Sequence, residues 1–356
     1  MIAECGFRIA EACNTHSAIR IAQSAMKSSA IPNPKSAMVK ASYFFIESLL
    51  HPATGLAASR EGECYTTVYK NALAAMALLH EGNRVAAERI FDIFRKYYQI
   101  QRDNFQGLPR VWDVCAALPD AKSIHWEGES AFLLLALNYY RQVTGGYGKY
   151  QDFAQGLMRW LVQRANACEQ LLADGIANMY AALQPFAGDP AIQLCLNRLR
   201  ACFFAEGKIS SRDYEQVLEH IVRGALVFGD ASGFKHIPNF ARSEMWAFDQ
   251  TTEIAAYSAF ASDRFINVEI SAQLLLAAKI WQPELPLDLF HLQRELEKLC
   301  VSGKSNSQSA GLPYFVTERG FECAHALPII QPTCYLLFYF WEFNPFAPGK
   351  KFAEQT

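Results

Sequence analysis

Apolar residues recur at helical spacing along most of this chain. Between residues 84 and 98, one face carries apolar residues while charged residues occupy the others, which is the pattern of a helix that buries one side. The residues of that apolar face are Val85, Ile90, Phe91 and Phe94. Segments 150–165 and 213–228 repeat this pattern. We therefore predict three outer helices, each with one side exposed to solvent.

A second group of segments is apolar on every side and rich in small residues. These segments begin near Asn71, Glu129, Ile176 and Pro332. A helix without a polar face has to be buried. Strand signals, in which apolar and polar residues alternate, are nearly absent. The alternation of one-sided with all-round apolar helices predicts an inner ring of helices shielded by an outer ring.

The predicted helices are about twelve in number, enough for six hairpins closed into an all-α (α/α)6 toroid. Segment 248–261 fits the inner ring by composition and the outer ring by strict alternation, so the order of the C-terminal helices stays open. Residues 1–30 allow one extra amphipathic helix outside the ring. The approximate spans of the predicted helices are 35–50, 65–80, 84–98, 127–143, 150–165, 176–186, 190–204, 213–228, 248–261, 263–281, 284–300 and 332–342.

Composition and charge fit one large folded domain. Hydrophobic residues make up 51% of the chain and charged residues 19%, and no Gly/Ser/Pro-rich linker divides it, so residues 1–356 are predicted to form a single toroid. The formal net charge is -2 and the basic residues are scattered, so no surface for nucleic acid is indicated.

Features of membrane insertion and of standard secretion are missing from the sequence. No stretch of about 18 uninterrupted apolar residues occurs, so no membrane span is predicted. Glu4 and Glu11 stand where a signal peptide would have its apolar stretch. We therefore expect a cytoplasmic protein.

The cysteines and histidines give no sign of a metal site. No CxxC pair occurs among the ten cysteines, and no HxxxH or HExxH spacing occurs among the histidines. We expect reduced cysteines that pack as small apolar residues, no catalytic metal and no cofactor. Six cysteines lie inside helix-like apolar patterns: Cys64, Cys168, Cys195, Cys202, Cys300 and Cys334.

Two of the long polar loops end in the same acidic tripeptide. Glu61-Gly62-Glu63 precedes the predicted 65–80 helix, and Glu127-Gly128-Glu129, after Trp126, opens the predicted 127–143 helix. In a helical ring such loops gather at one mouth, where sites usually lie. Acidic residues also favour the first turn of a helix because they offset its dipole. The repeated tripeptide thus has both a structural and a functional explanation.

Paired carboxylates suit the hydrolysis of glycosidic bonds, in which one protonates the leaving oxygen and the other activates water or attacks the sugar. Crowding of glutamates at a dry mouth raises the pKa of at least one of them. Glu63 and Glu129 would then tune that pKa or hold sugar hydroxyls. Aromatic side chains near the loops are candidates for stacking on sugar faces: Tyr65, Tyr69, Trp112, Trp126 and Trp246.

A third acidic set follows Trp246 in the sequence. Asp249 and Glu253 are four residues apart, which places them on one face of the predicted 248–261 helix. They are candidate substrate-binding residues, and a solvated acidic stripe is the alternative interpretation.

The run from Glu61 to Tyr65 resembles the Ser-Glu-Gly-Gln-x-Tyr motif of glycoside hydrolase family eight. Glu61 takes the position of that family's general acid, and Glu63 stands where the motif has glutamine. Trp126 to Glu129 is similar to the family's Asp-Gly-Asp element, and the end from Pro332 to Phe346 resembles the last helix of bacterial six-hairpin glycosidase-like proteins. The resemblance implies an (α/α)6 toroid fold and hydrolysis with inversion of configuration at the anomeric centre.

These observations favour a hydrolase of an oligosaccharide or polysaccharide, with Glu61 as the proton donor and Glu127 as its catalytic partner. A toroid that binds glycans or proteins without catalysis is the main alternative. Other chemistry on the same ring includes that of an isoprenoid cyclase, a lyase or an epimerase. The aspartate-rich motif of a cyclase is missing, and an epimerase would want histidines at the mouth, where the sequence places His125.

Overall fold

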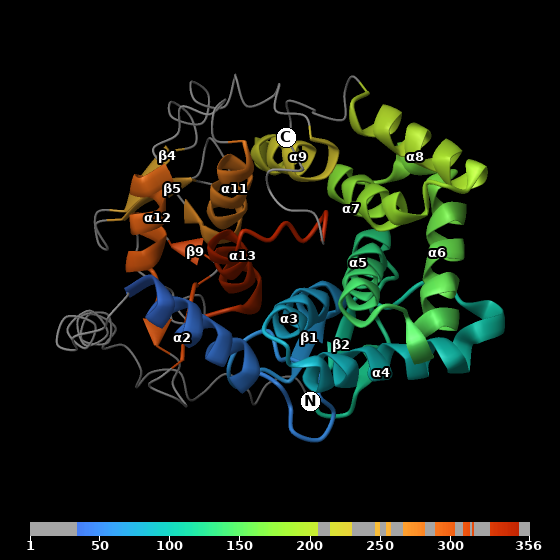
Figure 1. Cartoon of the computed structure of the whole chain (residues 1–356), viewed down its shortest axis with the longest axis horizontal. Helices are drawn as coiled ribbons and strands as arrows, with labels where there is room; N and C mark the ends of the chain where they lie inside the picture. Colours follow the sequence, from blue (N-terminus) through green and yellow to red (C-terminus); the bar gives the residue numbers. More distant parts are fainter. Residues whose placement is uncertain are drawn as a thin grey trace.

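The computed structural model describes residues 34–205, 214–229, 246–249, 254–257, 266–281, 289–302, 309–313, 315–316 and 328–348. Within these ranges the chain forms eleven α-helices and nine short β-strands. Six helices surround a common centre and five lie outside them (Figure 1). The predicted helical toroid is therefore confirmed. The possible helix within residues 1–30 lies outside the described residues.

The inner ring consists of six helices, each packed against the next, and the last closes against the first. Apolar residues are buried on every side of α3 and α11, as the small and apolar composition of these segments requires. The inner helices are α3 (Val68–His80), α5 (Glu127–Thr144), α7 (Ala173–Leu183), α9 (Tyr214–Phe228), α11 (Val268–Ile280) and α13 (Ile330–Trp341).

The described outer helices each cover neighbouring inner helices. In α4, for example, Ile90, Phe91 and Phe94 are buried, as expected of a helix with one apolar face. Val85, which was predicted to lie on the same face, is exposed. The outer helices are α2 (Pro34–Ser48), α4 (Arg84–Gln101), α6 (Gln151–Ala165), α8 (Pro190–Phe203) and α12 (Leu289–Lys298).

Two sequence-based assignments are wrong. Segment 213–228, predicted to be an outer helix, is inner helix α9, and its polar residue Arg223 is buried at the ring centre rather than exposed. Segment 248–261 is not one helix, because Trp246–Asp249 (β4) and Ile254–Tyr257 (β5) pair as antiparallel strands. The strand β5 packs on α11 and α12, and such tertiary contacts outweigh a weak helical pattern.

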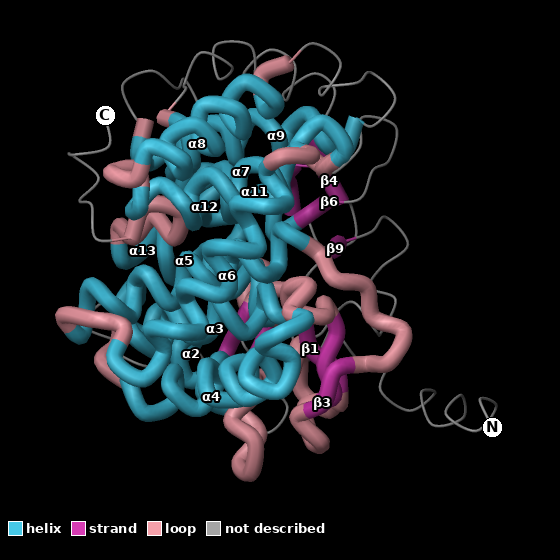
Figure 2. The backbone as a smooth tube through the Cα atoms, turned by 90° about the vertical axis from the view of Figure 1, so that its right-hand side faces the viewer, coloured by secondary structure: helices cyan, strands magenta, loops and turns pink. Residues whose placement is uncertain are grey.

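The short strands gather at one end of the ring (Figure 2). The largest described sheet joins β1 (Tyr65–Thr67), β2 (Val111–Asp113) and β3 (Leu118–Pro119) in antiparallel order. Because β1 pairs with β2, helix α3 begins at Val68 instead of residue 65, and the Thr67 side chain caps it by accepting from the Lys70 N–H. The remaining pairs are β6 (Ile266–Asn267) with β9 (Phe315–Val316), and β7 (Val301–Ser302) with β8 (Ala310–Gly311).

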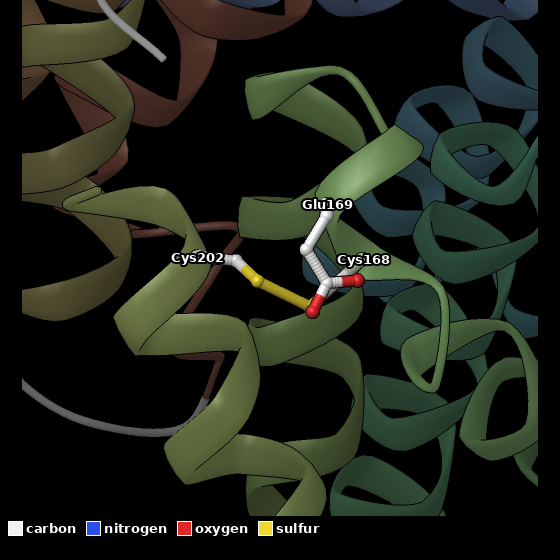
Figure 3. A group of neighbouring side chains, drawn as sticks. All are labelled: Cys168, Glu169 and Cys202. Carbon is white, nitrogen blue, oxygen red and sulfur yellow. A yellow bond between two sulfur atoms is a disulfide. The ribbon is translucent and has the colours of Figure 1, made fainter. Parts of the chain in front are cut away.

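A disulfide joins Cys168 to Cys202, 34 residues further along the chain, with a Cα–Cα distance of 6.4 Å (Figure 3). It links the 3-10 turn Cys168–Gln170 to α8. The prediction that all cysteines are reduced is therefore wrong for this pair, because spacing along the sequence gives no information about a contact between two distant segments. Cys195, Cys300 and Cys334 are free and buried, as predicted for small core residues, whereas Cys64 is exposed, so the prediction is wrong for Cys64.

None of the described helices has the length and apolar character that crossing a membrane requires.

Candidate functional site

A cavity of about 550 Å³ opens at the N-terminal ends of the inner helices, within the usual range of small-molecule sites. Tyr69, Gly128, Asp174, Glu269 and Gln331 are each the second residue of an inner helix, and all five line the cavity. The helix starts therefore define its floor. Its charged lining residues are the acids Glu63, Glu129, Asp174 and Glu269 and the bases Arg60, Lys70, Arg110 and Arg223.

Glu129 is the most deeply buried acid of this set, with an exposed fraction of 2%. Its carboxylate accepts a hydrogen bond from the backbone N–H of Tyr69 and lies 3.2 Å from Arg110 Nε. Burial raises the pKa of Glu129 to about 7, against the lowering effects of the Tyr69 N–H, Arg110 and Lys70. A carboxyl group with this pKa exchanges protons near neutral pH.

Tyr69 connects Glu129 to a second buried acid, Glu269. The Tyr69 backbone binds Glu129, while its hydroxyl donates to Glu269 Oε1 at 3.0 Å and lies 2.7 Å from the Tyr335 hydroxyl. Gln273 Nε2 donates to the same Glu269 oxygen at 3.1 Å. Burial and then the charge of Glu269 raise the pKa of Tyr69 well above its ordinary value, so the phenol stays protonated and orients the carboxylate.

An aromatic wall stands beside the acids. The guanidinium of Arg110 lies 5.2 Å above the ring of Trp126, in the range of a cation–π contact. A Cβ at Gly128 would lie 3.3 Å from both the Trp126 ring and Asn178 Nδ2, so a glycine here lets the indole pack against the start of α5. Arg223 Nη1 donates to Asn178 Oδ1 at 2.7 Å and thereby joins α9 to α7.

Two more cations belong to the cavity wall. Lys70 Nζ donates to Ser59 Oγ at 2.8 Å, and burial lowers the pKa of this ammonium group. Arg60 Nε lies 2.6 Å from Glu63 Oε1. The cavity lining thus carries four acids and four cations, a balance that suits a polar, hydroxyl-rich ligand better than a strongly charged one.

The structure brings together part of the predicted site. Glu63, Trp126 and Glu129 line the cavity. Glu61 lies in the turn before β1 and is not among the lining residues. Glu127 points to the outer ring, where its carboxylate accepts from Arg164 Nε of α6 at 2.5 Å. The predicted catalytic pair therefore does not face the cavity.

Two of the predicted aromatic residues also lie outside the cavity lining. Trp112 is buried in the core against Phe94, and its Nε1 donates to Pro109 O, so it is no sugar platform. Tyr65 is 54% exposed and lies outside the cavity lining.

The third predicted acidic set has a different backbone from the one expected. Trp246 and Asp249 are the two ends of β4 and pair with β5, so Asp249 lies in a strand and not in the predicted helix. Glu253 lies outside the described residues.

Sequence reasoning missed most of the polar residues that complete the cavity. Asn178 and Glu269 lie in helices that are mostly apolar, and Arg223 lies in a helix predicted to be an outer one. A single polar side chain in a helix that must be buried requires a partner or a ligand. That signal was present in the sequence, whereas the contact of Arg110 with Glu129 depends on a long loop and could not be inferred from spacing.

The described residues contain one group of three potential metal ligands, and it lies away from the cavity. The ligand atoms of Cys168, Glu169 and Cys202 lie within 4.8 Å of one another (Figure 3). Two of them form the disulfide and Glu169 pairs with Arg198 at 2.9 Å. A cysteine binds zinc as a thiolate, so neither cysteine of this group can bind zinc as a thiolate while the disulfide is intact.

Comparisons with known proteins support the fold. No family model matches the chain, and no curated protein matches it in sequence. An α-amylase from Clostridium perfringens is similar in structure, with a TM-score of 0.62 and 14% identity over 86% of this chain and 98% of that one. A D-mannose isomerase gives a TM-score of 0.60 and 11% identity over 86% and 96%. A cellobiose 2-epimerase from Spirochaeta thermophila gives 0.59 and 12% over 92% and 98%.

The chain therefore shares the fold of these structures, an (α/α)6 toroid. Identities of 11 to 14% establish this architecture and nothing finer.

Proposed function

We propose that this chain is a carbohydrate-active enzyme that hydrolyses a glycosidic bond in the cavity at the N-terminal mouth of the ring. The observation that carries the proposal is the buried carboxyl group of Glu129, whose pKa is raised to about 7. A general acid for a glycosidic oxygen must hold its proton near neutral pH. In this proposal Glu129 takes the role that the sequence motif suggested for Glu61.

Glu269 is the partner carboxylate. It lies on the far side of the Tyr69 side chain from Glu129, and Tyr69 and Gln273 both donate to it. Two donors hold the carboxylate in one orientation, which a base that activates water requires. Inversion of the anomeric centre would require the two carboxyl groups to stand about 6.5 to 9.5 Å apart.

Sugar binding is supported by the rest of the cavity wall. Trp126 offers an aromatic face, while Asn178, Asp174 and Lys70 offer donors and acceptors for hydroxyl groups. The similar structures include an α-amylase, a sugar isomerase and a glycosidase in complex with glucose. We take an oligosaccharide or the end of a polysaccharide as the substrate.

The test is a turnover assay on α- and β-glucans, xylans and chitosans with wild type, Glu129→Gln and Glu61→Gln. Glu129→Gln removes the proton and keeps the shape, so we expect turnover to fall on the order of a hundredfold or more. Glu61→Gln is the matched control and should leave turnover within about twofold of wild type.

Loss of activity in Glu61→Gln with retention in Glu129→Gln would favour the sequence motif over the cavity geometry. Oligosaccharide binding without turnover of any glycan, unchanged in Glu129→Gln, would replace the enzyme with a glycan-binding toroid. For an active enzyme, proton NMR of the first product anomer separates inversion from retention.

A further inference from the structure

Two exposed cysteines lie on neighbouring strand ends beside the cavity, outside the proposed catalytic site. Cys64 precedes β1 and Cys115 follows β2, and both are exposed. Val114 N donates to Cys64 O at 2.7 Å, which extends the β1–β2 ladder by one residue. Cys115 is the next residue after Val114, and the Cys64 side chain contributes to the raised pKa of the Cys115 thiol. The backbone pairing therefore places two accessible thiols near each other.

The backbone geometry suits a covalent bond between these sulfurs. Residues directly opposite in an antiparallel pair stand about 4.5 to 5.5 Å apart at Cα, and disulfides span about 4.4 to 6.8 Å. Cys115 comes one residue after the partner of Cys64, in a turn closed by Ala117 N donating to Asp113 O at 3.0 Å. The pairing therefore places Cys115 next to the residue opposite Cys64, in a turn at the end of the ladder.

We propose that Cys64 and Cys115 are a reversible dithiol–disulfide pair, oxidised by low-molecular-weight disulfides, that fastens the cavity-wall turn bearing Arg60 and Glu63 to the end of β2. This site is separate from the buried Cys168–Cys202 disulfide, whose two cysteines are buried.

The exchange needs no oxidant other than the small disulfide. The Cys64 thiolate attacks one sulfur of that disulfide, its S–S bond breaks, and one small thiolate leaves. Cys115 then loses its proton and attacks Cys64, which forms the protein disulfide and releases the second small thiol. Two protein thiols are oxidised and one small disulfide is reduced to two thiols.

The order of attack follows from the effect of Cys64 on the Cys115 thiol. Partial desolvation and then the Cys64 side chain raise the pKa of the Cys115 thiol, so Cys115 keeps its proton while Cys64 reacts. Thiolates, not thiols, are the nucleophiles in such exchange.

The consequence for the cavity follows from the turn next to Cys64. Glu63 N donates to Arg60 O at 3.3 Å, Gly62 has a φ of +79°, and the Arg60 and Glu63 side chains pair at 2.6 Å at the cavity wall. A bond from Cys64 to Cys115 restricts this turn, because it removes the opening motions that separate the turn from β2.

The chemical test equilibrates the full chain with mixtures of reduced and oxidised glutathione, followed by acid quenching and peptide mass mapping. Wild type should form a Cys64–Cys115 cross-link that excess reduced glutathione reverses. In Cys115→Ser, glutathione should remain bound to Cys64, because no second thiol resolves the mixed disulfide. Cys195→Ser, a change at a free buried cysteine, should leave the cross-link unchanged. Separate glutathione adducts on both wild-type cysteines, or no reaction, would overturn the proposal.

Hydrogen exchange tests the effect on the cavity wall. In oxidised wild type, the amides of residues 60–64 should exchange about tenfold more slowly than in reduced wild type. In Cys64→Ser the oxidant should change nothing in this segment. A cross-link that leaves these exchange rates unaltered would show that the bond does not fasten the turn.

Discussion

The first turn of α5 carries two glutamates, one on the side that faces the cavity and one on the side that faces the outer ring of helices. Glu129 faces the cavity, where it contacts Tyr69 and Arg110 and its pKa is raised to about 7. Glu127 faces outer helix α6 and is neutralised by Arg164. Residues two apart on an α-helix point about 200° from each other. A Glu-x-Glu pair therefore separates a structural acid from a reactive one.

The largest expected effect on the cavity side comes from its second acid. Glu269→Gln removes the charge that activates water while the Tyr69 and Gln273 contacts hold the side chain in place, so turnover should fall on the order of a hundredfold or more, with little change in KM. Steady-state kinetics on the best glycan and a thermal melt for folding measure this. Turnover within tenfold of wild type would remove Glu269 from the chemistry.

Stability should depend on pH through Glu129. The folded-state pKa of about 7 exceeds the ordinary value of 4.5, so the folded state binds the proton more tightly. The free energy of unfolding therefore falls as the pH rises from about 4.5 to about 7, by on the order of 3 kcal/mol for this group.

Glu129→Gln removes this dependence, so the variant should gain stability relative to wild type between pH 4.5 and pH 7. Urea unfolding of both proteins at several pH values measures the difference, with Glu127→Gln as a control for the outer side. A constant difference across this range would contradict the assigned pKa.

A smaller effect is expected at the aromatic wall. Trp126→Ala removes the ring beside Arg110 and should weaken oligosaccharide binding about tenfold, because aromatic contacts contribute roughly 0.5 to 1.5 kcal/mol beyond burial. Trp112→Phe is the matched control, since Trp112 is buried in the core. It should lower the melting temperature and leave the dissociation constant unchanged. Equal loss of affinity in both variants would place the sugar elsewhere.

The smallest effect on catalysis is expected on the outer side of α5. Glu127→Gln keeps a hydrogen-bond acceptor for Arg164 and loses one charge, at a cost of about 1 kcal/mol in stability, because Arg164 is partly exposed. Turnover should stay within about twofold of wild type. A large loss of turnover with an unchanged melting temperature would restore Glu127 to the active site.

The fold was predictable from sequence because the burial of a helix face requires apolar residues at helical spacing along the chain. All-round apolar segments such as those of α3 and α13 became inner helices, and the one-sided α4 became an outer helix. The assignment of α9 to the outer ring was wrong, because a polar residue that lines a central cavity, as Arg223 does, gives the same sequence pattern as one exposed to solvent.

The candidate site was predictable only in part. Acids at the start of α5 and Trp126 were found, since they sit next to an obvious helix start. The sequence did not show which of these acids faces the cavity. For Glu127 and Glu129 the answer depends on the rotation of helix α5 about its axis. For Glu61 it depends on the β1–β2 pairing, which places Glu61 in a turn ahead of α3. Glu269 lies far along the chain from Tyr69, and only the closed ring brings them together.

The most direct test is a pH titration of carboxyl groups by infrared difference spectroscopy, with Glu129→Gln and Glu127→Gln as the two reference proteins. The account predicts a protonated-carboxyl band that disappears with a midpoint at about pH 7 in wild type and in Glu127→Gln. That band should be absent from Glu129→Gln. A wild type in which every carboxyl group titrates near its ordinary pKa, or a neutral-pH band that persists in Glu129→Gln, would contradict the assignment of Glu129 as the proton donor of the cavity.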